Sequence, residues 1–184
     1  MVHMKQKCYN YDIILQLLKQ PNYIRGLAKE LNTNPMMVSR TLRQLTSENV
    51  VDASKQGKNK LYRIKRSIES LQMIMMAERY KLIQILQKYL RLRRVIQAVQ
   101  EEDVVLAVLF GSYAKGTATK ESDIDLFIEA KNKNIKAKLE LVDSKISVKV
   151  GKYDPSASLA KEIWKHHTII KGVEKFYEYY PVPE

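Results

Sequence analysis

Two aspartates stand two residues apart in the C-terminal half of the chain. Asp123 and Asp125 lie within residues 122–128, which read as a strand, and alternate residues of a strand share one face. Two neighbouring carboxylates repel each other unless a cation lies between them. A hard divalent ion such as Mg²⁺, with triphosphate oxygens as further ligands, would meet that need. The pair therefore indicates a metal site, although an isolated Asp-x-Asp on a strand is more often a solvated edge.

A turn that contains glycine precedes the two aspartates. Residues 104–110 form a continuous apolar run, typical of a strand that is buried on both faces. The run ends at Gly111 and Ser112, where a glycine lets another group approach the backbone closely. If a helix follows over residues 113–115, backbone amides near Ser112 would face an anion. Gly116 closes this short turn, which we expect to bind phosphate.

The order of these residues, GS, then G, then SDIDL, resembles the polymerase-beta-type nucleotidyltransferase superfamily in its minimal form, of the archaeal and bacterial type. The resemblance covers roughly residues 100–175. It implies a mixed-sheet α/β domain that uses a nucleoside triphosphate, with ATP as the first choice. The implied nucleotide-binding residues are Gly111, Ser112, Gly116 and Ser122, of which Ser112 and its neighbouring amides would hold the β/γ-phosphates. The implied catalytic residues, which would also ligate one or two Mg²⁺ (or Mn²⁺) ions, are Asp123 and Asp125.

One feature of the superfamily has no obvious counterpart. Active members usually add a third carboxylate from a later strand. The corresponding strand here, residues 145–150, has Lys145, Ser147 and Lys149 on its polar face. Asp143 and Asp154 lie only at its ends. Without this carboxylate, nucleotide binding can persist while transfer is weak or absent.

The first 66 residues carry a different pattern. Apolar spacing predicts helices over residues 11–19, 23–31 and 35–47, with Asn22 and Asn34 as N-caps and Pro35 in the first helical turn. Two short strands, residues 50–54 and 60–64, flank a hairpin tip that contains Gly57. This order over residues 8–66 resembles a winged helix-turn-helix domain.

Charge supports a polyanionic partner for this domain. Residues 1–66 have a net charge of +9, whereas residues 101–184 have a net charge of −1. The resemblance implies that the third helix enters the major groove of double-stranded DNA while wing lysines meet phosphates. The expected DNA-binding residues are Ser39, Arg40, Arg43, Gln44, Lys55, Lys58 and Lys60. The alternative is that the domain binds another protein.

Residues 67–100 read as a helical connector with a net charge of +4 and neither Gly nor Pro. One long helix or two joined helices would both fit its apolar spacing. Homodimerisation through this segment would match a two-fold DNA site. The expected organisation is α+β: a winged helix-turn-helix domain (1–66), the connector (67–100) and a nucleotidyltransferase-like domain (101–184). The aromatic tail, residues 177–184, is expected at the surface.

The sequence also argues against several locations. Cys8 is the single cysteine, so an intramolecular disulfide is excluded and a reducing compartment is favoured. The N-terminus lacks the apolar run of a signal peptide, and the longest pure apolar run has seven residues, too short for a membrane span. We expect a cytoplasmic protein with no membrane partner.

Two classes of function remain open. The first is a DNA-binding enzyme that carries out Mg²⁺-dependent nucleotidyl transfer from a nucleoside triphosphate to an unknown acceptor. The second is a DNA-binding transcriptional regulator whose nucleotidyltransferase-like domain binds nucleotide or a partner without catalysis, or an antitoxin-like module. The Gly-Ser turn and the paired aspartates favour the enzyme. The basic wing and the missing third acid favour the regulator.

Overall fold

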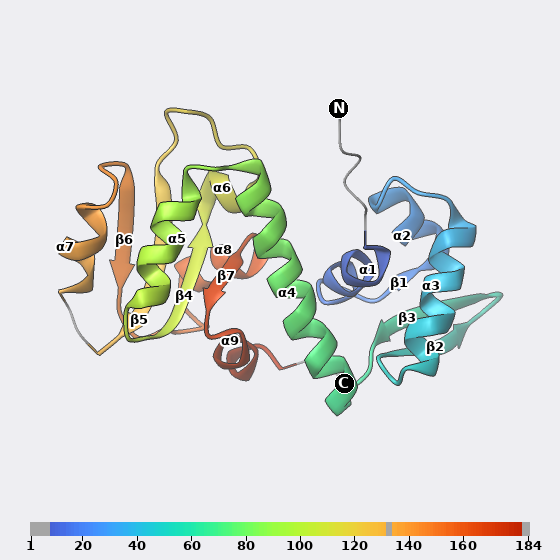
Figure 1. Ribbon diagram of the computed structural model, residues 1–184. Coiled ribbons are helices and arrows are strands. Elements are labelled where there is room, and N and C mark those ends of the chain that lie inside the picture. The colour runs from blue at the N-terminus through green and yellow to red at the C-terminus, as the bar shows by residue number, and fades with distance from the viewer. Residues whose placement is uncertain (1–7, 132–133, 182–184) are drawn as a thin grey trace. The chain divides into compact units, whose positions relative to one another are not determined.

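The computed structural model describes residues 8–131 and 134–181, and these fall into two compact units (Figure 1). The first unit extends to Ala77, and the second runs from Glu78 to Pro181. The boundary lies within one helix, α4 (Ile68–Lys88). No helix in the described ranges has the length and apolar character that a membrane span requires.

The first unit is a winged helix-turn-helix domain, as the sequence predicts. Its three antiparallel strands lie in the order β1-β3-β2. Its elements, in chain order, are α1 (Tyr9–Leu17), β1 (Asn22–Tyr23), α2 (Ile24–Glu30), α3 (Pro35–Ser47), β2 (Val51–Gln56) and β3 (Asn59–Ile64). Its core consists of fully buried apolar side chains from the three helices, among them Ile13, Ile14, Leu27, Val38, Leu42 and Leu45.

Local sequence signals set the limits of α3 and of the wing. The Asn34 side chain accepts a hydrogen bond from the backbone N–H of Met37 at 2.8 Å, and Pro35 follows it at the first helical position. The β2–β3 hairpin turns through Gly57 and Lys58, and Gly57 has a φ of +60°. Glycine adopts this left-handed conformation at little cost, so the chain reverses sharply there.

The second unit is built on a mixed four-stranded sheet in the order β6-β5-β4-β7, in agreement with the predicted fold class. Strands β5 and β6 are parallel, and the other neighbours are antiparallel. Its remaining elements, in chain order, are α5 (Leu92–Glu101), β4 (Val104–Phe110), α6 (Gly111–Lys115), β5 (Ile124–Ala130), α7 (Ile135–Glu140), β6 (Ile146–Val150), α8 (Ser158–Lys165), β7 (Thr168–Lys171) and α9 (Val173–Tyr179).

Of the two arrangements that the sequence allows for the connector, the structure has two helices. Helix α4 ends at Lys88 and α5 begins at Leu92, although no Gly or Pro separates them. Arg91, between the two helices, forms a two-pronged ion pair with Asp143 in the turn before β6. This long-range contact holds the chain at the break.

The two faces of the sheet in the second unit carry different side chains. One face packs against α5 and α7, and its core includes Val95, Ile96, Leu126, Ile135 and Val148. Residues that alternate with these along the strands lie on the other face, toward α8 and α9. There, Phe127 makes an edge-to-face contact with Tyr153 at 5.2 Å between ring centroids. Asp125 lies on this second face.

A buried polar cluster joins α4 to α9 and to the segment before β7. The Glu78 side chain is 1% exposed, accepts a hydrogen bond from the Tyr177 hydroxyl at 3.0 Å and lies 3.3 Å from Nε2 of His167. Burial raises the pKa of Glu78, but the Lys81 ammonium and the hydrogen bonds from His167 and Tyr177 outweigh it and lower the pKa to about 2. This carboxylate is therefore ionised inside the unit.

Candidate functional site

The fold brings Asp125 against the glycine turn. Asp125 pairs with Phe110, the last residue of β4, so it lies beside the point where the chain leaves that strand. Gly111 comes next, with a φ of +67°, and a Cβ built on it would lie only 2.2 Å from Oδ2 of Asp125. Position 111 must therefore be glycine for the carboxylate to lie where it does. Asp123 directly precedes Ile124, the first residue of β5, and is exposed.

The turn itself is closed by its own hydrogen bonds. Helix α6 begins at Gly111 and ends at Lys115, and its C-cap Gly116 has a φ of +75°. The Thr117 backbone N–H donates to the Ser112 carbonyl at 3.0 Å, and Lys88 of α4 donates to the Gly116 carbonyl at 2.6 Å. These contacts hold Ser112 and Gly116 in one short, tightly closed segment after β4.

Ser122 holds the loop that leads to the aspartates. Its hydroxyl accepts a hydrogen bond from the Thr119 backbone N–H at 2.9 Å. This bond makes a tight turn immediately before Asp123. The structure therefore gives Ser122 a role in shaping the loop.

Charges of both signs surround Asp125. Burial raises the pKa of its carboxyl, and the charge of Asp123 raises it further, whereas Lys149 and Lys115 lower it and Glu162 raises it. The site therefore combines two carboxylates that repel each other with positive charges from lysines. This combination suits a divalent cation between the carboxylates and a polyphosphate on the lysines.

The strand next to Asp125 supplies no third carboxylate. Ser147 pairs with Asp125 in the parallel β5–β6 register, so both side chains lie on one face. Asp143 is held by its ion pair with Arg91, and Asp154 accepts hydrogen bonds from Ser156. Within residues 8–131 and 134–181, no three Asp, Glu, His or Cys side chains lie close enough together to hold a metal ion. A cation held by the two aspartates would therefore need its remaining ligands from outside these side chains.

Three charged residues at this site are not among the site residues that the sequence predicts. Lys115, Lys149 and Glu162 lie on α6, β6 and α8, far from one another along the chain. The structure shows an ion pair of 3.7 Å between Lys115 Nζ and Glu162 Oε1. Lys115 lies within the Gly111–Asp125 motif, whereas only the folded sheet and its covering helix bring Lys149 and Glu162 to Asp125.

The expected DNA-binding residues lie on α3 and on the wing of the first unit. Arg40, Arg43 and Gln44 are exposed on α3, whereas Ser39 is half-buried. The three wing lysines are also exposed: Lys55, Lys58 and Lys60. A cavity of about 510 Å³ lies where α2, α3 and the wing meet, and Arg25 and Lys60 both line it. Arg25, which is exposed and is not among the predicted DNA-binding residues, adds a cation to this face.

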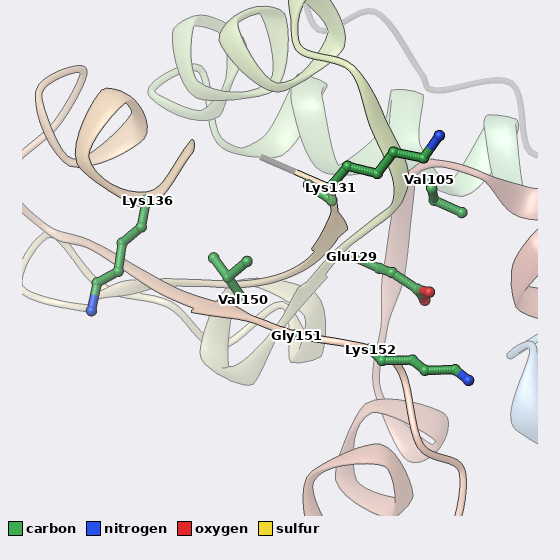
Figure 2. Close-up of a pocket in the computed structure, with 8 residues that line it drawn as sticks. Val105, Glu129, Lys131, Lys136, Val150, Gly151 and Lys152 are labelled. Carbon is green, nitrogen blue, oxygen red and sulfur yellow. The ribbon is translucent and has the colours of Figure 1, made fainter. Parts of the chain in front are cut away.

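A second cavity lies at the opposite end of the strands from the aspartates. Figure 2 shows this cavity, which has a volume of about 680 Å³ and includes Val105, Glu129 and Gly151 in its lining. Its lining also includes Lys131, Lys136 and Lys152, and in Figure 2 the side chain of Lys136 points away from the other two. Its carboxylate, Glu129, accepts hydrogen bonds from the Tyr153 backbone N–H at 3.3 Å and the Tyr179 hydroxyl at 3.2 Å. The carboxylate of this cavity is therefore already hydrogen-bonded within the unit.

Comparison with known proteins agrees with the geometry of the second unit. Residues 92–177 match the family model of the nucleotidyltransferase domain. This part of the chain is therefore a nucleotidyltransferase domain, fused to a winged helix-turn-helix domain. The chain is also 55% identical over 31 residues to "Putative protein adenylyltransferase MJ1305" of Methanocaldococcus jannaschii, and the match spans 17% of this chain and 21% of that protein.

Solved structures with partial similarity include AdcR, ZitR and one toxin–antitoxin structure. The adhesin competence repressor AdcR of Streptococcus pyogenes has a TM-score of 0.37 at 16% identity, over 47% of this chain and 70% of that one. ZitR of Lactococcus lactis has a TM-score of 0.37 at 14% identity, over 55% and 66%. A toxin–antitoxin structure with AMP-PNP has a TM-score of 0.34 at 24% identity, over 54% and 77%.

Proposed function

We propose that the second unit transfers a nucleotidyl group from a nucleoside triphosphate, ATP first, to an acceptor hydroxyl. The observation that carries this proposal is the Asp125 carboxylate lying against Gly111, beside Asp123 and within electrostatic reach of Lys115 and Lys149. Phosphoryl-group chemistry depends mainly on positioning and on charge stabilisation, and this arrangement offers both. The nucleotidyltransferase family match supports the same reaction class.

The roles of the residues follow from their charge and position. Asp123 and Asp125 would hold Mg²⁺ (or Mn²⁺), which neutralises charge on the leaving pyrophosphate when bound. Ser112, with the Gly111–Gly116 turn, would cradle the β/γ-phosphates, and Lys115 and Lys149 would balance the remaining negative charge. Ser122 would fix the loop that presents Asp123.

For the acceptor, we propose a hydroxyl group on a protein. The name of the Methanocaldococcus jannaschii relative describes a protein adenylyltransferase, which suggests AMP as the transferred group. The site itself is open toward solvent on the side of Asp123, which is exposed, so a folded protein can approach it.

Label transfer tests this proposal. The protein is incubated with Mg²⁺ and each α-labelled nucleoside triphosphate, with and without extract of the source cells, beside Asp123→Asn/Asp125→Asn. Asp103→Asn, which changes an exposed aspartate at the opposite end of β4, is the matched control. We expect labelled protein with the wild type and the control but not with the double variant. Equal labelling in all three would exclude this site as the source.

We further propose that the first unit binds duplex DNA through α3 and the wing. Its net charge of +9, with the exposed Arg40 and Arg43, supports this partner. Binding of labelled duplex DNA is compared for the wild type, Arg40→Ala/Arg43→Ala and the charge-matched Lys19→Ala/Lys29→Ala. Loss of affinity only in the arginine variant is expected. Equal loss in both variants would indicate a general charge effect instead.

The specific observation that favours a second candidate function is Ser147. With a hydroxyl where related enzymes carry an acid, the domain would bind nucleotide without transferring it, and the protein would be a nucleotide-sensing DNA-binding regulator or an antitoxin-like module. Two measurements separate the functions. A regulator shows DNA affinity that changes with nucleotide, and it shows no label transfer.

Homodimerisation through residues 67–100 remains part of the proposal. Ile83 and Leu90 are apolar yet more than half exposed within this segment, at 52% and 62%. Burying such side chains against a second copy would be favourable. Sedimentation equilibrium of the wild type and of Ile83→Lys/Leu90→Lys tests this point, and a monomeric wild type would exclude it.

A further inference from the structure

The proposed transfer reaction requires a group that accepts a proton. An acceptor hydroxyl that attacks phosphorus loses its proton as the new bond forms, and a positioned base usually takes that proton. Ser147, the residue that pairs with Asp125 on β6, has no carboxylate. Asp143 lies before β6, in an ion pair with Arg91, and Asp154 lies beyond the end of β6, hydrogen-bonded to Ser156. If transfer occurs here, another group must serve as the base.

Helix α8 lies over the same face of the sheet as Asp125. Ala160 and Ile163 are buried and fix the helix against the unit, and the Ala160 carbonyl accepts a hydrogen bond from Tyr153, whose ring packs on Phe127. Phe127 is the next residue after Asp125 on that face of β5. The helix is therefore anchored two residues along the strand from the proposed site.

Glu162 is the acid that α8 brings to this site. Its carboxylate lies 3.7 Å from the ammonium of Lys115, which belongs to α6 and lies within the Gly111–Gly116 turn. Its charge also reaches Asp125. The side chain is 52% exposed, so an acceptor that arrives from solvent can reach it. Glu162 thus combines proximity to the turn with access for the second substrate.

We propose that Glu162 accepts the proton of the attacking hydroxyl, in place of a carboxylate on β6; this inference rests on the proposed transferase function. In the step, the acceptor oxygen forms a bond to the α-phosphorus. The bond from the α-phosphorus to the oxygen bridging to the β-phosphorus breaks, and pyrophosphate leaves with that electron pair. The hydroxyl proton passes to Glu162. Lys115 holds the carboxylate on the side of the turn until the acceptor arrives.

A purely structural role for Glu162 makes a different prediction. If Glu162 only positions Lys115, its loss should resemble loss of Lys115, which would weaken binding of the triphosphate and raise KM while kcat is largely kept. Loss of a proton acceptor should instead lower kcat and leave nucleotide affinity unchanged. The two roles therefore separate in the KM–kcat comparison and in direct nucleotide binding.

The experiment compares the wild type with Glu162→Gln, Lys115→Met, Ser147→Asp and Glu162→Gln/Ser147→Asp. The control is Glu174→Gln, which changes an exposed glutamate on α9. Label transfer gives kcat and KM, and titration with a fluorescent, non-hydrolysable ATP analogue and Mn²⁺ gives the Kd. For Glu162→Gln we expect kcat to fall about 100-fold, the usual size of a general-base contribution, with an unchanged Kd. Adding Ser147→Asp should restore at least about 10-fold, because it places a carboxylate beside Asp125.

The possible failures are distinguishable. Wild-type kcat in Glu162→Gln, or a raised Kd with kcat kept, overturns the role of Glu162 and leaves the transferase function standing. If Ser147→Asp transfers label while the wild type is inactive, the role of Glu162 is also overturned. That result would show that Glu162 does not replace the missing carboxylate on β6. An absence of transfer in every protein refutes both the inference and the proposed function.

Discussion

Replacement of Gly111 by alanine is the sharpest test of the site geometry. Gly111 has a φ of +67°, and a Cβ on it would lie 2.2 Å from Oδ2 of Asp125. Real Cβ contacts are essentially never shorter than 3.0 Å, so the carboxylate would have to move by at least about 0.8 Å. A misplacement of about 1 Å at a reacting group can reduce a rate by about 100-fold.

We therefore expect Gly111→Ala to lower kcat/KM for label transfer by about 100-fold. The left-handed conformation adds roughly 1–2 kcal/mol of strain for a residue with a side chain. Gly57→Ala isolates this strain, because Gly57 has a φ of +60° with nothing within 4 Å of its Cβ position. Both variants should lose a similar free energy of unfolding in urea, but only Gly111→Ala should lose transfer.

Two results would refute this reasoning. Near wild-type transfer by Gly111→Ala would show that the Asp125 carboxylate does not need the position it has against the turn. A loss of transfer by Gly57→Ala equal to that of Gly111→Ala would trace the effect to general destabilisation. Circular dichroism of both proteins at the assay temperature confirms that each is folded.

Three further predictions follow from other parts of the molecule. The pKa of Glu78 is about 2 in the folded protein, and its ordinary value is 4.5. The ionised carboxylate should therefore stabilise the fold by on the order of 3 kcal/mol above pH 4.5. This stabilisation should be lost as the pH falls toward 2. Urea unfolding of Glu78→Gln should accordingly show a weaker pH dependence than the wild type below pH 4.5, and an unchanged dependence would contradict the assignment. Lys55→Ala/Lys58→Ala should reduce the slope of log K against log salt for duplex DNA by about 2, whereas an unaltered slope would remove both wing lysines from the phosphate contacts. Gly172→Ala should lower the free energy of unfolding by at least about 2 kcal/mol. Gly172 has a φ of +78°, and a Cβ on it would lie 2.2 Å from the Val105 carbonyl oxygen. A loss no larger than that of a neutral surface substitution would contradict this close approach.

Elements with strong local signals could be predicted closely. Helix α3 spans Pro35–Ser47, as the Asn34–Pro35 pair and the apolar spacing indicate, because both signals act within a single turn. Strand β4 spans Val104–Phe110, the whole of the apolar run. In these segments, capping and burial favour the same conformation, so the local sequence is sufficient.

Elements that depend on distant partners could not be predicted. Asn22 was expected to cap the second helix, but it belongs to β1, pairs with Tyr62 forty residues later, and leaves Tyr23 at the N-cap. The short strand has too few residues to produce a periodic pattern. The expectation of an aromatic surface segment after residue 176 was wrong for Tyr177, which is buried and donates its hydroxyl hydrogen to Glu78. The last three residues of that segment lie outside the described residues.

The same division applies to the candidate site. The Gly111–Asp125 motif is continuous in the sequence and could be recognised by residue type and spacing. Lys149 and Glu162 reach Asp125 only through the β5–β6 register and the placement of α8. Their positions depend on which strand pairs with which and on the face that α8 covers. Neither the strand pairing nor the position of α8 can be predicted from the residues that neighbour Lys149 and Glu162 in the sequence.

The buried Glu78 also constrains how α4 can be seated on the second unit. Its carboxylate meets Tyr177 of α9 and His167 from the segment before β7, and both contacts lie in the interior. If α4 slid by one turn, or rotated about its axis, an ionised group would remain in the interior without these partners, at a cost of several kcal/mol. Apolar contacts alone would tolerate such alternative seatings more readily, since they are not directional. The buried carboxylate therefore favours one translational and rotational position of α4 over the others.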